Sequence, residues 1–384
     1  LLLREFNKKD FVLPLKPQYD EILDRKIRRE AEGLKGALVL DPKIGLHTDC
    51  IVYLDFKAMY PSIFISYNIC PTTLLPRDSM LDSMEAPNGA KFISKNIREG
   101  LIPQIVKHLI EERDIVRAQM KKTTDDAHKK ILDAKQYALK VMANSFYGYT
   151  GYVRARLYVL DIANAITSCG RYLIQKTKQI VESDKNFEVI YGDTDSIMVK
   201  TATRNVDDAF NVGAALEAKI NGELKGIVEM KIENVFKTLL ILSKKRYAGL
   251  TIEKSNGALK EKISMKGIET VRRDWCDLTS ETLYGVLDIM LKEGDPKKAL
   301  NYVKAVVADL DKIKIPVEKL VITKSISKPM KDYKGMQPHI ELLKKKYTVI
   351  NLNFWMQLVN LKKNCNYNTT TIIYFYKVRD CDNC

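Results

Sequence analysis

Residues 187–200 read FEVIYGDTDSIMVK. Apolar and β-branched residues flank a short polar turn on both sides, which is typical of two strands joined by a tight hairpin. The turn contains two acids, Asp193 and Asp195. Because a carboxylate in such a place loses hydration, the pattern predicts either a cation site or a turn in which aspartate accepts backbone hydrogen bonds.

A second buried strand is predicted at residues 51–56, IVYLDF, because the run is short, continuous, β-branched and aromatic. It carries one acid, Asp55, near its end. Oxygen donors from two strands suit a hard divalent ion, so Asp55 strengthens the metal interpretation of Asp193 and Asp195.

Residues 102–148 have helical periodicity interrupted by the polar turn 122–126, which predicts an antiparallel helical hairpin. The two expected apolar stripes are Ile102, Ile105, Val106, Leu109 and Ile110, and then Ile131, Ala134, Ala138, Val141 and Met142. The polar faces carry Arg113 and Arg117 on the first helix and Gln136, Lys140, Asn144 and Tyr147 on the second. Such cations are suited to clamp a polyphosphate, although each alone is also typical of a solvated helix face.

The composition describes a folded, basic chain. The 384 residues include 63 Lys and Arg and 48 Asp and Glu, which gives a net charge of +15. Hydrophobic residues make up 46% of the chain. This excess of cations favours a polyanionic partner. No apolar run approaches the roughly 20 residues of a membrane span, and seven scattered cysteines are typical of unpaired thiols in a reducing compartment.

Ordered motifs along the chain resemble those of family B DNA polymerases. DFKAMYPSI (55–63), LKVMANSFYGYTGY (139–152) and YGDTDS (191–196) resemble motifs A, B and C of that family. KKRY (244–247) and KGIETVRRD (266–274) follow where the family contacts primer and template, and TKSISKPMKDYKGMQPH (323–339) is similar to its thumb signature. NSFYGYTGYVRARLY (144–158) looks most like archaeal replicative members, with large DNA viruses second.

The resemblance implies an α+β fold of the right-hand polymerase type, with an antiparallel-sheet palm, helical-hairpin fingers and a partial helical thumb. The expected boundaries are palm 1–89 and 149–271, fingers 90–148, thumb 272–344, and an atypical, possibly out-of-frame tail 345–384. No Asp is followed two residues later by Glu, the metal pair of the family's exonuclease. We therefore expect a fragment or split subunit without that domain.

The resemblance also implies roles for individual residues. Asp55, Asp193 and Asp195 are the expected catalytic acids, and together with Phe56 they are expected to hold two Mg²⁺ ions, with Mn²⁺ as a substitute. The expected nucleotide-binding residues are Phe56, Met59, Tyr60, Arg113, Arg117, Lys140, Asn144 and Tyr147, assisted by backbone N–H groups of residues 56–60. The expected DNA-binding residues are Lys244, Lys245, Arg246, Tyr247, Lys266, Arg272 and Lys324.

The implied reaction is template-directed DNA synthesis in replication or repair, with transfer of deoxynucleotides from dNTPs to a primer 3′-hydroxyl. Primer–template DNA and dNTPs are the expected partners, a sliding clamp would bind through regions outside this chain, and no membrane is expected. The expected location is the cytoplasm of an archaeal-like cell, or the nucleus or a viral factory otherwise. Two alternatives remain open: a catalytically silent DNA-binding remnant, and a two-metal nuclease or phosphohydrolase using the same acids.

Overall fold

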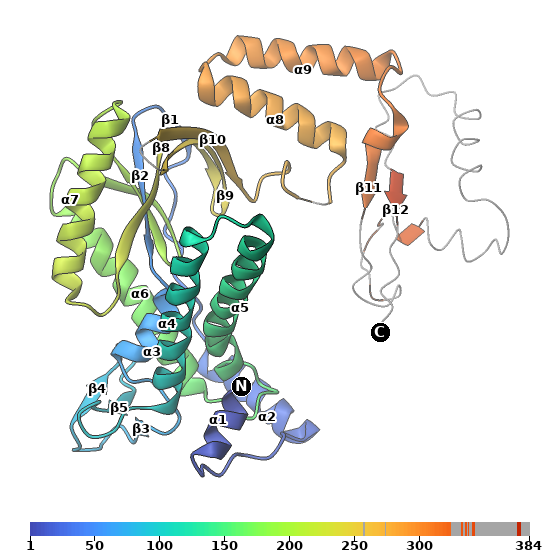
Figure 1. Cartoon of the computed structure of the whole chain (residues 1–384). Coiled ribbons are helices and arrows are strands. Elements are labelled where there is room, and N and C mark those ends of the chain that lie inside the picture. Colours follow the sequence, from blue (N-terminus) through green and yellow to red (C-terminus); the bar gives the residue numbers. More distant parts are fainter. Residues whose placement is uncertain are drawn as a thin grey trace. The chain divides into compact units, whose positions relative to one another are not determined.

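The computed structural model describes residues 1–255, 258–272, 274–323, 332, 335, 337, 340–341 and 375–377 (Figure 1). Within these residues, no helix has both the length and the apolar character needed to cross a membrane. The chain divides into two compact units. One comprises residues 1–238 and 251–262, and the other residues 239–250 and 263–384.

The largest sheet is antiparallel, and its strand order is β10-β9-β8-β2-β7-β6, with β1 paired to β8. The central strand β2 therefore lies between β7 and β8. The strands are β1 (Gly45–His47), β2 (Ile51–Phe56), β6 (Glu188–Asp193), β7 (Ser196–Lys200), β8 (Met230–Ser243), β9 (Arg246–Ser255) and β10 (Ala258–Lys266). The predicted hairpin at 187–200 and the predicted strand at 51–56 are confirmed, and so is the antiparallel, mixed α+β fold.

Helices cover this sheet and form the main core. The helix α6 (Leu160–Glu182) contacts β6 and β7, and α7 (Val206–Leu224) contacts β2. In β2 every side chain except that of Asp55 is buried, because helices and neighbouring strands enclose it. Smaller elements complete the unit: α1 (Leu2–Lys8), α2 (Tyr19–Glu32), α3 (Met59–Ser66), and a sheet of β3 (Leu74–Leu75), β5 (Lys91–Ile93) and β4 (Ser83–Glu85).

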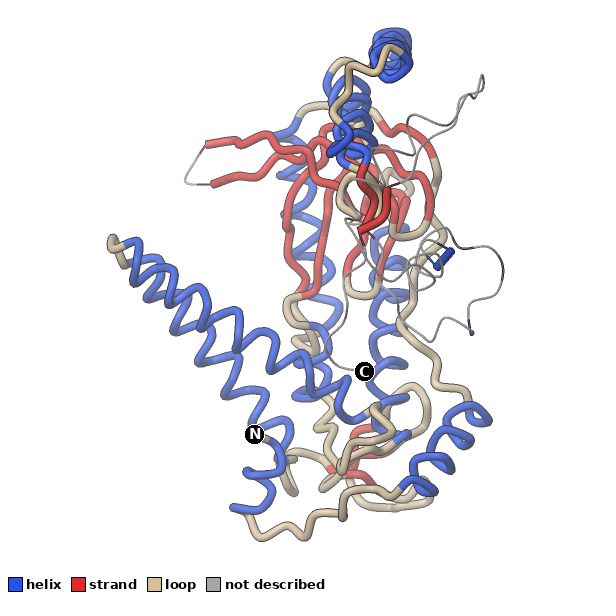
Figure 2. The backbone as a smooth tube through the Cα atoms, turned by 90° about the vertical axis from the view of Figure 1, so that its right-hand side faces the viewer, coloured by secondary structure: helices blue, strands red, loops and turns tan. Residues whose placement is uncertain are grey.

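The predicted helical hairpin is confirmed as α4 (Leu101–Lys122) and α5 (Asp126–Thr150), which lie side by side (Figure 2). Asp125 begins α5, because its side chain accepts a hydrogen bond from the Ala127 N–H at 3.0 Å. On α4 the predicted stripe is buried at Ile102, Val106 and Leu109.

The apolar stripe predicted on α5 is wrong. Ile131 is 67% exposed and Val141 is 49% exposed, and the buried side chains are instead Leu132, Ala143, Phe146 and Thr150. The reason is that α5 packs not only on α4 but also on α3 and α6. A large aromatic ring gains more from burial than the alanines of the predicted stripe, so Phe146 sets the rotation of the helix.

Within the second unit, α8 (Asp277–Lys292) and α9 (Pro296–Asp311) pack together in the span expected as the thumb. A small core forms from Ala248, Leu250, Ile268, Leu287 and Leu291. A 3-10 turn, η1 (Val317–Leu320), then leads to β11 (Val321–Thr323). Of the expected tail 345–384 the described part is β12 (Phe375–Lys377), which pairs in parallel with β11.

The rotation of α5 generates a first prediction. Phe146→Ala should lower the free energy of unfolding by about 3–5 kcal/mol, because it removes a ring that is 4% exposed. Ile131→Ala, on the same helix, should change the free energy of unfolding by less than about 1 kcal/mol. Urea titration followed by far-UV circular dichroism measures both; equal losses would mean that the exposed stripe is part of the core after all.

Candidate active site

The backbones of the three predicted acids reach neighbouring positions at one end of the sheet in the first unit. Asp55 of β2 and Asp193 of β6 both stand opposite Ser196 of β7 in the strand registers. The Phe56 N–H donates a hydrogen bond to the Asp195 carbonyl oxygen at 2.8 Å. A strand end and a turn that are far apart in the sequence therefore meet at neighbouring backbone positions.

The turn between β6 and β7 is held by local hydrogen bonds. Thr194 has a left-handed backbone with φ of 62°, and its hydroxyl donates to the Asp193 carboxylate at 3.1 Å. The Asp195 N–H donates to the Asp193 carbonyl oxygen at 2.7 Å, and the Thr194 N–H donates to the Leu38 carbonyl oxygen at 3.0 Å. Asp193 thus has a structural role in the turn, whatever else its carboxylate binds.

The acids create a region of negative potential. Burial raises the pKa of Tyr53 well above its ordinary value, and the charges of Asp55 and Asp195 add to this effect against an opposing hydrogen bond with Ser196. In the described part of the chain, no three His, Cys, Asp or Glu side chains lie close enough together to hold a metal ion. The available donors here are carboxylate and carbonyl oxygens, which are the ligands that Mg²⁺ prefers.

The segment that leaves β2 is fixed on both sides. Besides the Phe56 bond to the hairpin turn, the Lys57 N–H donates to the Glu229 carbonyl oxygen at 2.8 Å. Ala58 then adopts a left-handed backbone with φ of 49° and begins α3. The Lys57 ammonium lies 3.5 Å from the Asp114 carboxylate of α4, so this segment also contacts the helical hairpin.

Tyr60 and Tyr147, predicted from separate motifs, are in direct contact. Their ring centroids are 4.7 Å apart and the ring planes meet at 25°, a stacked arrangement. Burial raises the pKa of Tyr60 to about 12, and electrostatic interactions with Tyr147 and Asp195 make smaller contributions in the same direction. Met59 is 2% exposed and belongs to the main core, so its side chain faces the protein interior.

The polar face of the hairpin is organised around Arg113. Its Nε donates to the Gln136 side-chain oxygen at 3.2 Å, which joins the two helices. Burial, and then the charge of Arg117, lower the pKa of Arg113, although an arginine stays protonated at neutral pH. Lys140 and Asn144 follow Gln136 on successive turns of α5, and both are exposed.

In the second unit, the KKRY segment forms the turn between β8 and β9. Lys244 and Lys245 are exposed, whereas Tyr247 is buried in that unit. Arg246 forms an ion pair with Glu269, and its Nε is buried without a hydrogen-bond partner.

Two further predicted DNA contacts, Lys266 and Arg272, also lie in the second unit. Lys266 is exposed at the end of β10. The Arg272 guanidinium binds both carboxylate oxygens of Asp274, at 3.0 and 2.8 Å. Lys324 falls outside the described residues.

Gly267 supports this turn and was not among the predicted site residues. Its φ is +65°, and a Cβ at this position would collide with the Lys245 carbonyl oxygen. The backbone of Lys245 is itself left-handed, with φ of 62°. A glycine directly after Lys266 in the motif was the available signal, because such close approach of two backbones excludes any side chain.

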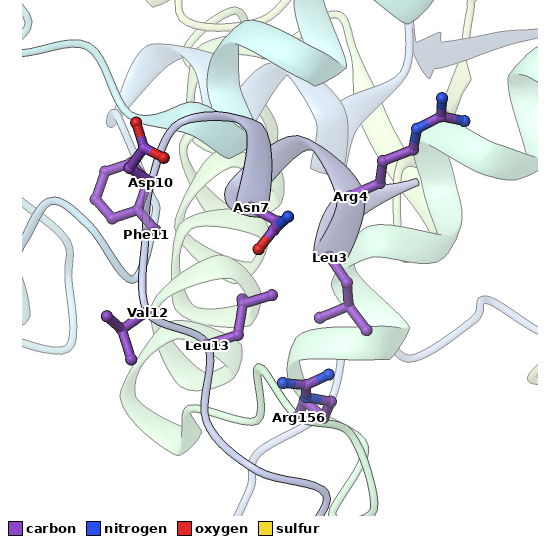
Figure 3. Close-up of a pocket in the computed structure, with 8 residues that line it drawn as sticks. All are labelled: Leu3, Arg4, Asn7, Asp10, Phe11, Val12, Leu13 and Arg156. Carbon is purple, nitrogen blue, oxygen red and sulfur yellow. The ribbon is translucent and has the colours of Figure 1, made fainter.

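A cavity of about 650 Å³ lies elsewhere, between α1, residues 10–13 and Arg156 (Figure 3). It contains none of the predicted site residues. In Figure 3 the Arg4 side chain extends to the upper right, away from Arg156 at the lower centre, so their charges do not converge on one point. The Arg156 Nε donates to the Pro14 carbonyl oxygen at 2.6 Å, which gives this arginine a structural role.

Comparison with known proteins places these motifs in context. Residues 1–353 match the family described as DNA polymerase family B. The chain is 37% identical over 344 residues to the DNA polymerase of Thermococcus gorgonarius, covering 90% of this chain and 43% of that protein. It is 39% identical over 331 residues to the DNA polymerase delta catalytic subunit of Plasmodium falciparum, covering 82% of this chain and 30% of that protein.

A solved structure of the same family is similar to this chain. The family B DNA polymerase of the hyperthermophilic archaeon Pyrobaculum calidifontis aligns with a TM-score of 0.63 at 33% identity, over 92% of this chain and 43% of that one. The chain therefore spans less than half the length of these relatives.

The contact between Gly267 and Lys245 generates a second prediction. Gly267→Ala should lower the free energy of unfolding by about 3 kcal/mol or more, because it combines left-handed strain with a backbone collision. Gly294 is a matched control in the same unit, with φ of +66° and nothing within 4 Å of its Cβ position. Gly294→Ala should therefore cost only about 1–2 kcal/mol. Similar thermal midpoints for the two variants would contradict the close approach.

Proposed function

Because the chain belongs to DNA polymerase family B, we propose that it catalyses template-directed transfer of deoxynucleotides from dNTPs to a primer 3′-hydroxyl. The observation that supports this most is the meeting of Asp55, Asp193 and Asp195 at one end of the sheet, through the shared partner Ser196 and the Phe56–Asp195 hydrogen bond. The proposed context is replication or repair, in an archaeal-like cytoplasm or in a nucleus or viral factory.

The proposed metal ligands are the carboxylates of Asp55 and Asp195, with Asp193 weaker, and the carbonyl oxygen of Phe56. The chemistry of this donor set suits two Mg²⁺ ions, with Mn²⁺ as a substitute, because all of its atoms are hard oxygens. When bound, such ions lower the pKa of the primer hydroxyl and neutralise charge on the triphosphate and pyrophosphate.

The helical hairpin would supply the remaining charge for the triphosphate. Arg113 is oriented by Gln136, and Lys140 and Asn144 follow on the same face of α5, so these side chains can bind phosphate oxygens together. Arg117 is exposed one turn along α4 and is a weaker candidate.

Backbone donors assist at the start of α3. The Phe56 and Lys57 N–H groups are already used by Asp195 and Glu229, so the expectation that all of residues 56–60 serve phosphate is too broad. First-turn N–H groups have no acceptor within their own helix, which leaves those of Met59 and Tyr60 for this role. Met59 would act through its backbone alone.

Tyr60 would pack against the sugar of the incoming nucleotide, and Tyr147 would border the new base pair. The stacked rings support this pairing of roles, because each aromatic surface fixes the position of the other.

Contacts to the primer–template duplex are proposed for the second unit. Lys244 and Lys245 are exposed and suited to phosphate oxygens, and so is Lys266. Arg246, Tyr247 and Arg272 would act mainly by holding the loops, given their partners and burial. A DNA contact by Lys324 and binding of a sliding clamp are proposed on the resemblance alone.

Removing a catalytic acid tests the reaction. Asp195→Asn should reduce primer extension at least about 100-fold while the Kd for primer–template changes less than about twofold, because charge stabilisation in the transition state is lost. The control is Asp49→Asn: Asp49 precedes the other end of β2 and binds Lys200 and Arg204 instead.

The outcomes separate the alternatives. Extension by Asp195→Asn above about a tenth of the wild-type rate would reject this acid as a ligand. A wild-type chain that binds DNA without extending it would be a silent remnant, and one that shortens the primer without extending it would be a nuclease.

Salt dependence tests the lysines of the turn. Lys244→Ala/Lys245→Ala should weaken DNA binding for every sequence and lower the slope of log Kd against log salt by about two, near one unit per phosphate contact. The control is Lys298→Ala on α9, where the lysine binds Glu293 at 2.7 Å. An unchanged slope in the double variant would exclude both lysines from the phosphate contacts.

A further inference from the structure

Gly170 is a buried glycine well inside α6. Glycine destabilises a helix interior relative to alanine, because the unfolded chain has more backbone freedom to lose. No left-handed conformation explains its presence, since Gly170 is not among the residues with positive φ. The explanation therefore lies in the space around it.

That space is filled by the two side chains that begin α3. A Cβ at Gly170 would lie 3.2 Å from Met59 Cε, 3.5 Å from Tyr60 Cε1 and 3.9 Å from Met59 Sδ. The α6 backbone thus forms a wall directly against Met59 and the edge of the Tyr60 ring.

Neither partner has much room to move away. Met59 is 2% exposed in the main core, and the Tyr60 ring is stacked on Tyr147 at 4.7 Å. The next residue of α6, Arg171, donates from Nη1 to the carbonyl oxygens of Lys35 and Gly36 at 2.8 Å each. Because these two bonds and the contacts of α6 with β6, β7 and α7 hold the helix in place, a group added at Gly170 acts on Met59 and Tyr60 rather than displacing the helix.

We propose that Gly170 is a positioning residue for sugar selection: the missing side chain sets how far the Tyr60 ring can retract towards α6. This inference rests on the proposed function, in which that ring packs against the sugar of the incoming nucleotide. A methyl group at position 170 would remove the retraction space and leave less room for a 2′-hydroxyl.

The test compares insertion of dATP and ATP opposite template thymine, with Mg²⁺ and a primer–template. In Gly170→Ala the ratio of kcat/KM for dATP over ATP should rise about tenfold, while kcat/KM for dATP changes less than about threefold. Gly222→Ala is the control, because Gly222 lies in α7 with nothing within 4 Å of its Cβ position. It should leave the ratio unchanged.

Two further measurements make the result specific. Combining Gly170→Ala with Tyr60→Ala should abolish the effect of the methyl group, because the ring it pushes is gone. The ratio of Kd values for dATP and ATP on a dideoxy-terminated primer needs no chemistry and should move in the same direction. If Gly170→Ala lowers the thermal midpoint strongly, Met59→Ala/Gly170→Ala relieves the closest contact and is compared with Met59→Ala.

An unchanged or lower ratio in Gly170→Ala, with the Tyr60→Ala variant strongly altered, would overturn this inference and leave the sugar role of Tyr60 standing. An unchanged ratio in Tyr60→Ala would overturn both. Loss of extension with the Kd ratio preserved at the wild-type value would also overturn the inference.

Discussion

The hydrogen bond from the Phe56 N–H to the Asp195 carbonyl oxygen, at 2.8 Å, joins the end of the central strand to the turn of the β6–β7 hairpin. Two acidic segments that are distant in the sequence become neighbours through it. On the other side, the Lys57 N–H bonds to Glu229 and prevents the segment from moving outwards. Carboxylates held together in this way repel one another, so the buried sheet behind them must supply the stability that keeps them in place.

The segment at residues 56–57 also determines where the neighbouring helices lie. Directly after it, Ala58 turns the chain into α3, which contacts α4, α5 and α6. Tyr60 therefore meets Tyr147 of α5, and Lys57 reaches Asp114 of α4. Packed interiors respond to small shifts as units, so the rings and the acids have one common support.

Two glycines maintain close backbone approaches for different physical reasons. Gly267 requires both a left-handed conformation and the absence of a side chain against Lys245. Gly170 lies within a regular helix, and its position requires only the absence of a side chain against Met59 and Tyr60. In each case the proposed ligand contact belongs to a neighbouring residue, and the glycine determines where that neighbour lies.

Features that depend on residues close together in the chain are predictable from the sequence. The hairpin at 187–200, the buried strand with Asp55 and the helices on either side of residues 122–126 follow from short apolar patterns and turn residues. The rotation of α5, the burial of Met59 and the close approach of Gly170 to Tyr60 emerge only when the whole chain is folded. Those depend on volumes brought together from distant segments, and a helix with apolar residues on two faces does not encode which face the rest of the chain will cover.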